Sequence, residues 1–408
     1  MGSGPALGED GGIAKRLLVL GAGPAQLGLL RAARERGLFV IACDRDPGAP
    51  GFAYADRRAV VSAEDESALA HLARAERVDG VIAPGIDWPV AIAARVAAQV
   101  GLGHPLTPET ASLAVSKHRQ RERLAEAGVP QPGWRVAKDD VDGVPLPAVV
   151  KPADRQGQKG LTFVEERSAL AEAVRLAVSE SRAGLALVEE LVEGPEVTVN
   201  AFSSGGRFHG LTVTDRLTAP SPAFGVALAH AWPSETATAT AVEVARRAAE
   251  ALGITEGPTY TQLRLGADGP RVVEVAARLG GGHDAELCRV ALGIDLNRLA
   301  LAAALGEATA VPEPGPLVGG ACVRFLVAPE GVLQALEGME EAQEVEGVVE
   351  ARAYRVPGYR FGPFRRGADR AGFVLARGDS RDDALRRADR AARHIRFLTA
   401  DVEARVEA

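Results

Sequence analysis

A strand, a glycine turn, a helix and a second strand follow one another near the start of the chain. The apolar run Arg16–Leu20 leads into Gly21-Ala-Gly-Pro-Ala-Gln-Leu-Gly28, and a helical stretch then continues to about Arg36. A second apolar run ends at Asp44. This order is typical of a βαβ unit, in which a helix joins two parallel strands.

The same alternation continues over about the first hundred residues. Strand-like runs follow at 59–61 and 80–83, and helical patterns occur at 66–74 and 88–100. Strands that alternate with helices form a parallel sheet with helices on both faces. We therefore expect a Rossmann-like, doubly wound domain over residues 13–105.

From Pro147 onward, strands are separated by short turns and fewer helices. The strands are expected at 148–151, 161–164, 185–189, 196–202 and 207–214, and the helices at 168–181 and 234–252. Residues 259–265 and 271–276 predict a hairpin that turns at Asp268-Gly269. These patterns indicate an α+β domain with a mostly antiparallel sheet over 106–310, including a lid at about 130–190.

A proline-rich linker, Pro312-Glu-Pro-Gly-Pro316, precedes the last part of the chain. Short strands follow it, and Ser380 with Asp383 has the spacing of a capping box at a helix start. We expect a small C-terminal α+β domain over 317–408.

Composition narrows the functional class. The 408 residues carry a formal net charge of −7, without the basic excess typical of proteins that bind nucleic acids or anionic membranes. We therefore expect neither a nucleic acid nor a membrane as a partner.

Cys43, Cys288 and Cys322 match no metal-ligand spacing and suit buried positions in a reducing compartment. Met1–Gly12 is glycine-rich and acidic, unlike a signal peptide, so a cytoplasmic protein is expected.

The first glycine turn is a candidate phosphate site, but an imperfect one. Gly21 and Gly23 follow a strand, and Asp44 ends the next strand, where a ribose-binding acid would lie. Gln26 occupies the position of the third glycine of a dinucleotide fingerprint. A structural turn is therefore favoured over a nicotinamide site, although an NAD-dependent oxidoreductase stays open as an alternative.

Lysine is scarce in this chain, which makes each lysine informative. Lys151 ends an apolar strand, and the glycine-containing stretch Asp154–Gly160 follows it. An ammonium group beside a flexible glycine loop suits a polyphosphate. Taken alone, the segment fits equally an ordinary hairpin beside a strand-end lysine.

Two further segments supply acidic groups that a nucleotide and a metal would need. The connector Val188–Glu196 offers backbone groups for adenine and the Glu196 carboxylate for ribose hydroxyls, although it also fits a plain loop with a solvated acid. In the expected hairpin, Gln262 and Glu274 face a common site if the strands pair in register, and Arg278 follows them. Oxygen ligands beside phosphates are what Mg²⁺ selects.

In their order and spacing, these segments resemble the ATP-grasp superfamily of carboxylate–amine ligases from about Arg16 to Leu398. The motifs that carry the resemblance are Gly21–Gly28, Gly85–Trp88, Ser116–Arg119, Ala127–Pro130, Val150–Pro152, Val188–Glu190 with Glu196, and Glu274–Gly281. The resemblance implies an α/β and α+β ATP-grasp fold with a Rossmann-like first domain, and ATP with Mg²⁺, or else Mn²⁺, as cofactors.

The resemblance also implies a role for individual residues. ATP phosphates would contact Lys117, Lys151 and the 155–160 loop with Gly157, Lys159 and Gly160; adenine would contact Glu189, Glu190, Leu191 and Val192; and ribose would contact Glu196. The metal ligands would be Gln262 and Glu274, and the catalytic residues Arg278 and Lys151. The candidate substrate residues are Gly23, Asp87, His230, Gly281 and His283.

Several positions depart from the family pattern. Ala276 occupies a position where the family often has a metal-binding asparagine, and the phosphate loop has Gln158 and Lys159 where a serine is common. The tail resembles L-amino-acid ligases at Cys322–Val327, but Ala227 replaces a glutamate three residues before His230. This change suggests that one substrate is not a standard α-amino acid.

Both candidate histidines have alternative interpretations. His230 fits a core histidine better than a substrate contact, whereas His283 and its neighbour Asp284 are expected on an exposed loop after the glycines.

The sequence therefore predicts an ATP-dependent ligase that joins a small-molecule carboxylate to an amine through an acyl phosphate, and a homodimer is expected from the resemblance. A purine-pathway or carbamoyl-phosphate-type member of the superfamily and a non-catalytic ATP-binding protein remain alternatives, the latter because of Ala276.

Overall fold

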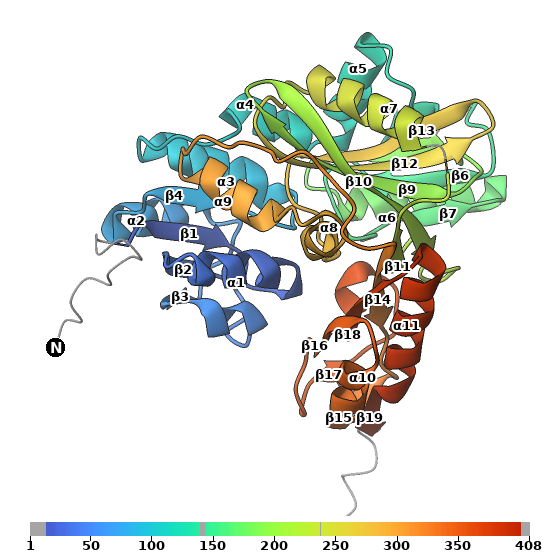
Figure 1. Cartoon of the computed structure of the whole chain (residues 1–408). Helices are drawn as coiled ribbons and strands as arrows, with labels where there is room; N and C mark the ends of the chain where they lie inside the picture. The colour runs from blue at the N-terminus through green and yellow to red at the C-terminus, as the bar shows by residue number, and fades with distance from the viewer. Residues whose placement is uncertain (1–13, 139–142, 237, 401–408) are drawn as a thin grey trace, which may run out of the picture.

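The computed structural model describes residues 14–138, 143–236 and 238–400. Parts of the three expected domains therefore lie outside the described residues: residue 13, lid residues 139–142, residue 237 and the tail 401–408. Within the described part, the strands form four sheets (Figure 1).

The first sheet is parallel, as the βαβ pattern predicts. Its order is β3-β2-β1-β4, and its strands are β1 (Arg16–Leu20), β2 (Phe39–Cys43), β3 (Arg57–Ala59) and β4 (Gly80–Ile82). The helices α1 (Leu27–Glu35), α2 (Glu66–Glu76) and α3 (Trp88–Gln99) connect or follow them. Because side chains alternate across a strand, Leu18 packs into one core and Leu17 into another. The second core includes residues of α9 (Leu296–Ala304), which packs against α1.

Two short helices, α4 (Pro108–Ala114) and α5 (Lys117–Glu126), lead to a small antiparallel sheet. The side chains of Thr107 and Ser116 cap their N-termini. The small sheet has the order β5-β8-β6-β7 and comprises β5 (Trp134–Ala137), β6 (Ala148–Pro152), β7 (Thr162–Val164) and β8 (Ala186–Glu190). Helix α6 (Arg167–Glu180) covers it, and this sheet with α6 is called the lid below.

The largest sheet has eight strands in the order β13-β12-β9-β10-β11-β14-β18-β16. Its strands are β9 (Glu196–Ser204), β10 (Arg207–Thr218), β11 (Ala227–Trp232), β12 (Gly257–Gly266), β13 (Gly269–Ala276), β14 (Gly320–Leu326), β16 (Val348–Ala353) and β18 (Gly372–Gly378). The pairing of β11 with β14 continues the sheet across the linker 312–316. The linker therefore separates two segments of one sheet.

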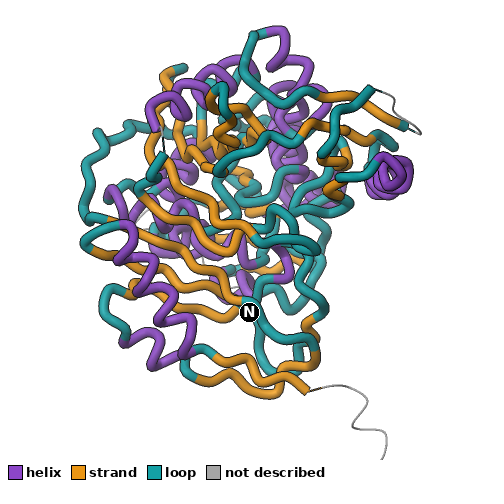
Figure 2. The backbone as a smooth tube through the Cα atoms, turned by 90° about the vertical axis from the view of Figure 1, so that its right-hand side faces the viewer, coloured by secondary structure: helices purple, strands orange, loops and turns teal. Residues whose placement is uncertain are grey.

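Helices lie against this sheet along its length (Figures 1 and 2). They are α7 (Thr238–Ala251), α8 (Asp284–Leu292), α10 (Met339–Glu344) and α11 (Arg381–His394), and Ser380 caps α11 as expected. A three-stranded sheet of β17 (Arg360–Phe361), β15 (Gly331–Glu337) and β19 (Arg396–Ala400) completes this end of the molecule.

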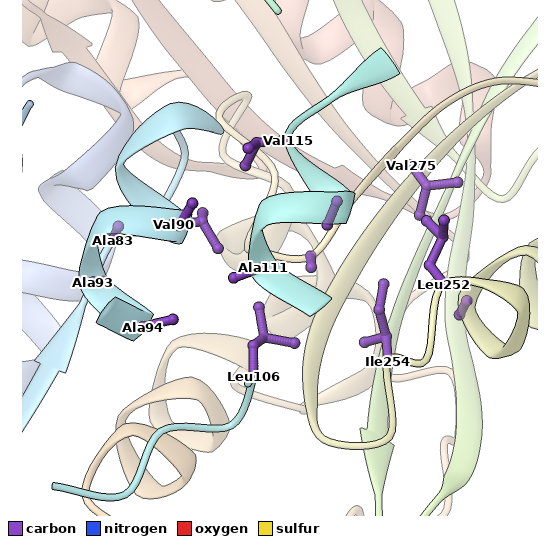
Figure 3. Packing of buried hydrophobic residues seen from close by; sticks show 14 of the residues in the cluster. Ala83, Val90, Ala93, Ala94, Leu106, Ala111, Val115, Leu252, Ile254 and Val275 are labelled. Carbon is purple, nitrogen blue, oxygen red and sulfur yellow. The ribbon is translucent and has the colours of Figure 1, made fainter. Parts of the chain in front are cut away.

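One apolar cluster connects the first domain to the large sheet (Figure 3). Val90 of α3 belongs to it, as do Leu106 and Ala111 from the connecting segment and Ile254 and Val275 near α7 and β13. Contiguous burial of this kind holds the elements around the site in a fixed arrangement.

The three cysteines are buried, as expected, and burial raises the pKa of each thiol to about 12. None of the helices in the described ranges is long and apolar enough to cross a membrane.

Candidate functional site

Most of the candidate site residues predicted from the sequence line two adjoining cavities. The larger cavity is lined by Gly23, Asp87, Gly157, His230, Gln262, Glu274, Arg278 and Gly281, among others. The smaller cavity is lined by Lys151, Glu189, Glu190, Leu191, Val192, Glu196 and Gln262, among others. Gln158 and Gln262 line both, so the cavities meet at β12 and at the loop 153–161 between β6 and β7, called the lid loop below.

The β12–β13 hairpin places the two predicted metal ligands together. Gln262 lies directly opposite Glu274, because a register shift between Gln262 and Leu263 follows the turn at Ala267-Asp268. Within the described ranges, no group of three or more His, Cys, Asp or Glu side chains gathers as a metal site. Mg²⁺ does not require such a group, because it commonly binds one or two carboxylates together with waters and substrate phosphates. The residues present therefore fit Mg²⁺ beside a polyphosphate.

A buried ionic network supports Lys151. Its Nζ lies 2.7 Å from Glu189 Oε2, and Arg121 Nε lies 2.8 Å from Glu189 Oε1. Burial opposes ionisation of Glu189, but the two cations hold its pKa at about 2. Burial lowers the pKa of Lys151, and the positive charges of Arg121 and Lys117 lower it further. Glu189 is thus a fixed anion that orients Lys151 at the wall of the smaller cavity.

Lys117 connects the start of α5 to the hairpin. Its Nζ lies 2.9 Å from Glu274 Oε1 and also donates a hydrogen bond to the carbonyl of Arg155 in the lid loop. Although burial opposes ionisation of Glu274, the neighbouring Lys117 holds its pKa at about 2. Glu274 therefore remains available as a carboxylate ligand at neutral pH.

Arg278 joins three parts of the molecule. Its Nε and Nη2 lie 2.7 and 2.6 Å from Asp87 Oδ1, at the start of α3. The backbone N–H of Asp87 in turn donates to the side-chain oxygen of Gln156 in the lid loop. The first domain, the large sheet and the lid thus meet at one guanidinium group in the larger cavity.

Glu196, the predicted ribose ligand, is enclosed by donors. It pairs with Arg216, accepts a 2.6 Å hydrogen bond from Gln262 Nε2 and lies 3.4 Å from Arg264 Nη2. A ribose in the smaller cavity would compete with these groups for the carboxylate.

Of the phosphate contacts predicted in the lid loop at Gly157, Lys159 and Gly160, only the first lines one of the two cavities. Gly157 has a φ of +66° and lines the larger cavity. Lys159 lines neither of the two cavities, and its Nζ lies 2.8 Å from Glu180 Oε2 of α6. Gly160, with φ +69°, also lies outside both, and a side chain there would meet Pro152 and Glu180.

His230 is a buried histidine that also reaches the larger cavity. Its Nδ1 lies 3.1 Å from Asp284 Oδ1, and this contact, against the effect of burial, helps hold the pKa of Asp284 below its ordinary value. Both of its expected roles are therefore compatible with its position.

The expectation of an exposed loop at His283 and Asp284 is wrong. Their exposed fractions are 6% and 1%. Helix α8 begins at Asp284, and the His283 ring stacks on Phe373 of β18 with 3.7 Å between ring centroids. The C-terminal strands, distant in the sequence, bury this turn. His283 is not among the residues that line the larger cavity.

Sequence reasoning missed several residues of the larger cavity, notably Arg216, Tyr260, Tyr354 and Arg370. Arg370 donates hydrogen bonds of 3.1 and 2.8 Å to the carbonyl of Ala227, and its guanidinium lies 3.7 Å from the Phe325 ring centroid. Burial lowers its pKa to about 10. The sequence offered only a weak signal, an arginine cluster at 365, 366 and 370 in a glycine-containing loop.

Two family models match the chain. Residues 144–286 match the ATP-grasp domain, and residues 324–400 match the L-amino acid ligase C-terminal domain 2. These two matches include the lid, the hairpin and most of the C-terminal strands.

Sequence relatives and solved structures add to these matches. The uncharacterized protein y4rH of Sinorhizobium fredii is 31% identical over 291 residues, which cover 68% of this chain but only 59% of that relative. The formate-dependent phosphoribosylglycinamide formyltransferase of Burkholderia pseudomallei is 29% identical over 412 residues, covering 95% and 96% of the two chains. The crystal structure of an L-amino acid ligase from Bacillus licheniformis has a TM-score of 0.82 at 24% identity, covering 95% and 99%. This last similarity concerns the fold.

Proposed function

We propose, from the premise that this chain belongs to the ATP-grasp superfamily, that it joins a carboxylate to an amine or another nitrogen nucleophile with release of ADP and phosphate. ATP-grasp enzymes use ATP and Mg²⁺. The observation that carries the proposal is the group of Gln262, Glu274 and Arg278 on the wall of the larger cavity, with Lys117 2.9 Å from Glu274.

The nucleotide would occupy the smaller cavity. Its connector residues Glu189–Val192 present backbone groups and apolar surface to adenine, and Lys151 provides a positive charge at the wall. The phosphates would then extend toward Gln262, where the cavities meet. Lys117, beside Glu274, and Gly157, at the wall of the larger cavity, would then contact the terminal phosphate, because a positive charge with loop amides suits phosphoryl transfer.

Gln262 and Glu274 would hold Mg²⁺, which offsets charge on the transferring phosphoryl group. Arg278 would stabilise the negative charge that develops as a carboxylate oxygen attacks the terminal phosphorus. Asp87 fixes the direction of Arg278 with two contacts, so the guanidinium is oriented before the reaction.

The larger cavity would bind the carboxylate substrate. Within the described ranges, Arg370 has no carboxylate within 4.0 Å, although it lies at the cavity wall. A half-buried guanidinium without a counter-ion favours an anionic ligand. Ala227, whose carbonyl binds Arg370, leaves this part of the wall without a carboxylate for a substrate ammonium group.

The test is ADP release with ATP and Mg²⁺ against amino acids and other carboxylates, singly and in pairs with amines. Glu274→Gln should abolish a pair-dependent signal, whereas Glu122→Gln, at an exposed residue of α5, should keep it. Failure of every pair, with ATP still raising the melting temperature, would favour an ATP-binding protein without this activity.

A purine-pathway or carbamoyl-phosphate-type reaction is the second candidate. The nearly full-length match to a formyltransferase favours it. Formate and bicarbonate in the same substrate set separate this candidate from an amino-acid ligase.

The NAD-dependent alternative is weakened by Gln26. This side chain is buried and donates a 2.7 Å hydrogen bond to the carbonyl of Pro84, so it serves the packing of the turn.

We also propose a homodimer, which light scattering tests directly. The mass of a single chain would contradict it.

A further inference from the structure

A buried chain of three side chains, joined by one hydrogen bond and one ion-pair contact, lies behind the larger cavity. His283 Nε2 lies 2.6 Å from the Tyr354 hydroxyl, and His283 Nδ1 lies 3.7 Å from Glu286 Oε2. All three residues are at most 9% exposed. None of them has a place in the nucleotide or metal chemistry described above.

This chain of side chains connects two cavities. Tyr354 lines the larger cavity. His283 and Glu286 line a third, small cavity, together with the partly exposed Arg31 and Glu350. These side chains therefore connect the wall of the larger cavity, through Tyr354 and His283, to a cavity near the surface.

Two positions in this arrangement are restricted in ways that packing alone does not require. His283 has a φ of +59°, a left-handed conformation that few residues other than glycine adopt, although asparagine, aspartate and histidine adopt it more often than the rest. A Cβ atom at position 28 would lie 1.5 Å from Glu286 Oε1, so the carboxylate reaches its position only because residue 28 is glycine. Strain of this kind is concentrated at functional sites.

We propose that Tyr354 and His283 remove a proton from the nitrogen nucleophile and pass it to the third cavity, with Glu286 holding His283 in position. This inference rests on the proposed ligase function. An amine enters as an ammonium group and has no lone pair for attack until it loses a proton.

The proton transfers balance as follows. The Tyr354 oxygen accepts a proton from the ammonium while its own proton moves to His283 Nε2, which gives a neutral amine and an imidazolium. The amine forms the C–N bond to the acyl carbon, and the bond from this carbon to the bridging phosphate oxygen breaks, with its electron pair leaving on phosphate. The departing phosphate takes the second proton from nitrogen. His283 then releases a proton from Nδ1 to water in the third cavity.

The charges around the path suit this assignment. Burial raises the pKa of Tyr354, so it acts as a neutral hydroxyl, although nearby Arg370 and Arg352 oppose the shift and Glu286 and Glu350 add to it. Burial opposes ionisation of Glu286, but the nearby His283 and a hydrogen bond from Asn297 hold its pKa below the ordinary value.

The experiment compares an ordinary amine with hydroxylamine, a nucleophile that is already neutral at neutral pH. Tyr354→Phe removes only the hydroxyl, and His283→Asn keeps a residue type that tolerates the left-handed conformation. Each variant should lose about 10²-fold in amide formation, the size typical of a lost acid–base group. Hydroxamate formation from the same carboxylate should stay within about twofold of the parent, because this reaction needs no base.

The pH dependence gives a second readout. In Tyr354→Phe, amide formation should keep rising with pH up to the pKa of the free amine, because only the neutral amine reacts without the relay. The control is Tyr359→Phe, whose ring lies at the surface against Arg355 and lines none of the three cavities.

Two results would overturn the relay: equal losses of amide and hydroxamate in Tyr354→Phe, or no loss of either. If the parent protein forms no hydroxamate and no ADP with any carboxylate, the ligase function itself fails, and the relay fails with it.

Discussion

Replacing Glu189 with glutamine tests the central ionic network of the lid. The carboxylate lies between Lys151 and Arg121, and all three side chains are buried. Its pKa falls from 4.5 to about 2, which corresponds to about 3 kcal/mol in favour of the ionised form at neutral pH. Glu189→Gln keeps the shape but leaves two buried cations without their anion. Breaking a buried pair in this way typically costs about 3–5 kcal/mol.

The neighbouring Glu190 provides a matched control. Its side chain is 30% exposed and lies 2.5 Å from Arg271, which is 31% exposed. Solvent screens such a pair, so Glu190→Gln should cost at most about 1 kcal/mol. The two variants carry the same chemical change at adjacent positions.

The assay is denaturant unfolding followed by the emission of Trp134. This residue lies directly opposite Glu189 in the pairing of β5 with β8, so it reports on the lid. Trp88 and Trp232 are replaced by phenylalanine, because separate domains of this chain need not unfold together. Equal midpoints for the Glu189 and Glu190 variants would refute the argument from burial and pairing.

The pH dependence has a definite sign. A carboxyl whose folded pKa is depressed stabilises the fold above its unfolded pKa of 4.5, and this contribution is lost as the pH falls toward about 2. The difference between the parent and Glu189→Gln should therefore be constant from neutral pH to about 5 and shrink below about 4.5. A difference that does not change over this acid range would contradict the assigned ionisation.

Three further changes have expected outcomes. Arg278→Lys should lower kcat for ADP release by about 10²- to 10³-fold with unchanged ATP affinity by titration calorimetry; an equal loss of affinity would argue for a binding role. Ala276→Asn should lower the Mg²⁺ concentration for half-maximal activity, because an amide oxygen is added two residues from Glu274 on the same strand face. Gly194→Ala should destabilise the fold by more than about 2 kcal/mol in denaturant unfolding, because its Cβ would lie 2.0 Å from the Leu265 carbonyl oxygen. Gly205→Ala meets open space and should cost only the strain of its positive φ, about 1–2 kcal/mol.

Local patterns predicted the hairpin correctly, but not the detail of its register. The observed turn is at Ala267-Asp268, and a register shift between Gln262 and Leu263 then places Gln262 opposite Glu274. The parallel first sheet was predictable for a similar reason, because alternating strands and helices leave few topologies. In both cases the information lies within a few tens of consecutive residues.

Such local patterns could not predict the pairing of strands that are distant in the sequence. The join between β11 and β14 brings His230 opposite Val323, across the linker at 312–316. Nothing in the linker itself indicates that the strands on its two sides share a sheet. For the same reason Arg370, which follows β17, could not be assigned to the wall of a cavity formed largely by earlier segments.

His283 shows why the burial of a glycine-rich turn is hard to predict. Three glycines precede it, a composition typical of exposed turns. Here each supports close packing: a Cβ on Gly280 would lie 2.1 Å from Asp284 Oδ2, and one on Gly281 would lie 2.9 Å from the Gly85 carbonyl oxygen. Small residues permit either exposure or close approach, and only the surrounding strands decide between them. The buried turn then places His283 against Tyr354. The packing that buries His283, contrary to the prediction of an exposed loop, is therefore the packing that positions the proposed proton path.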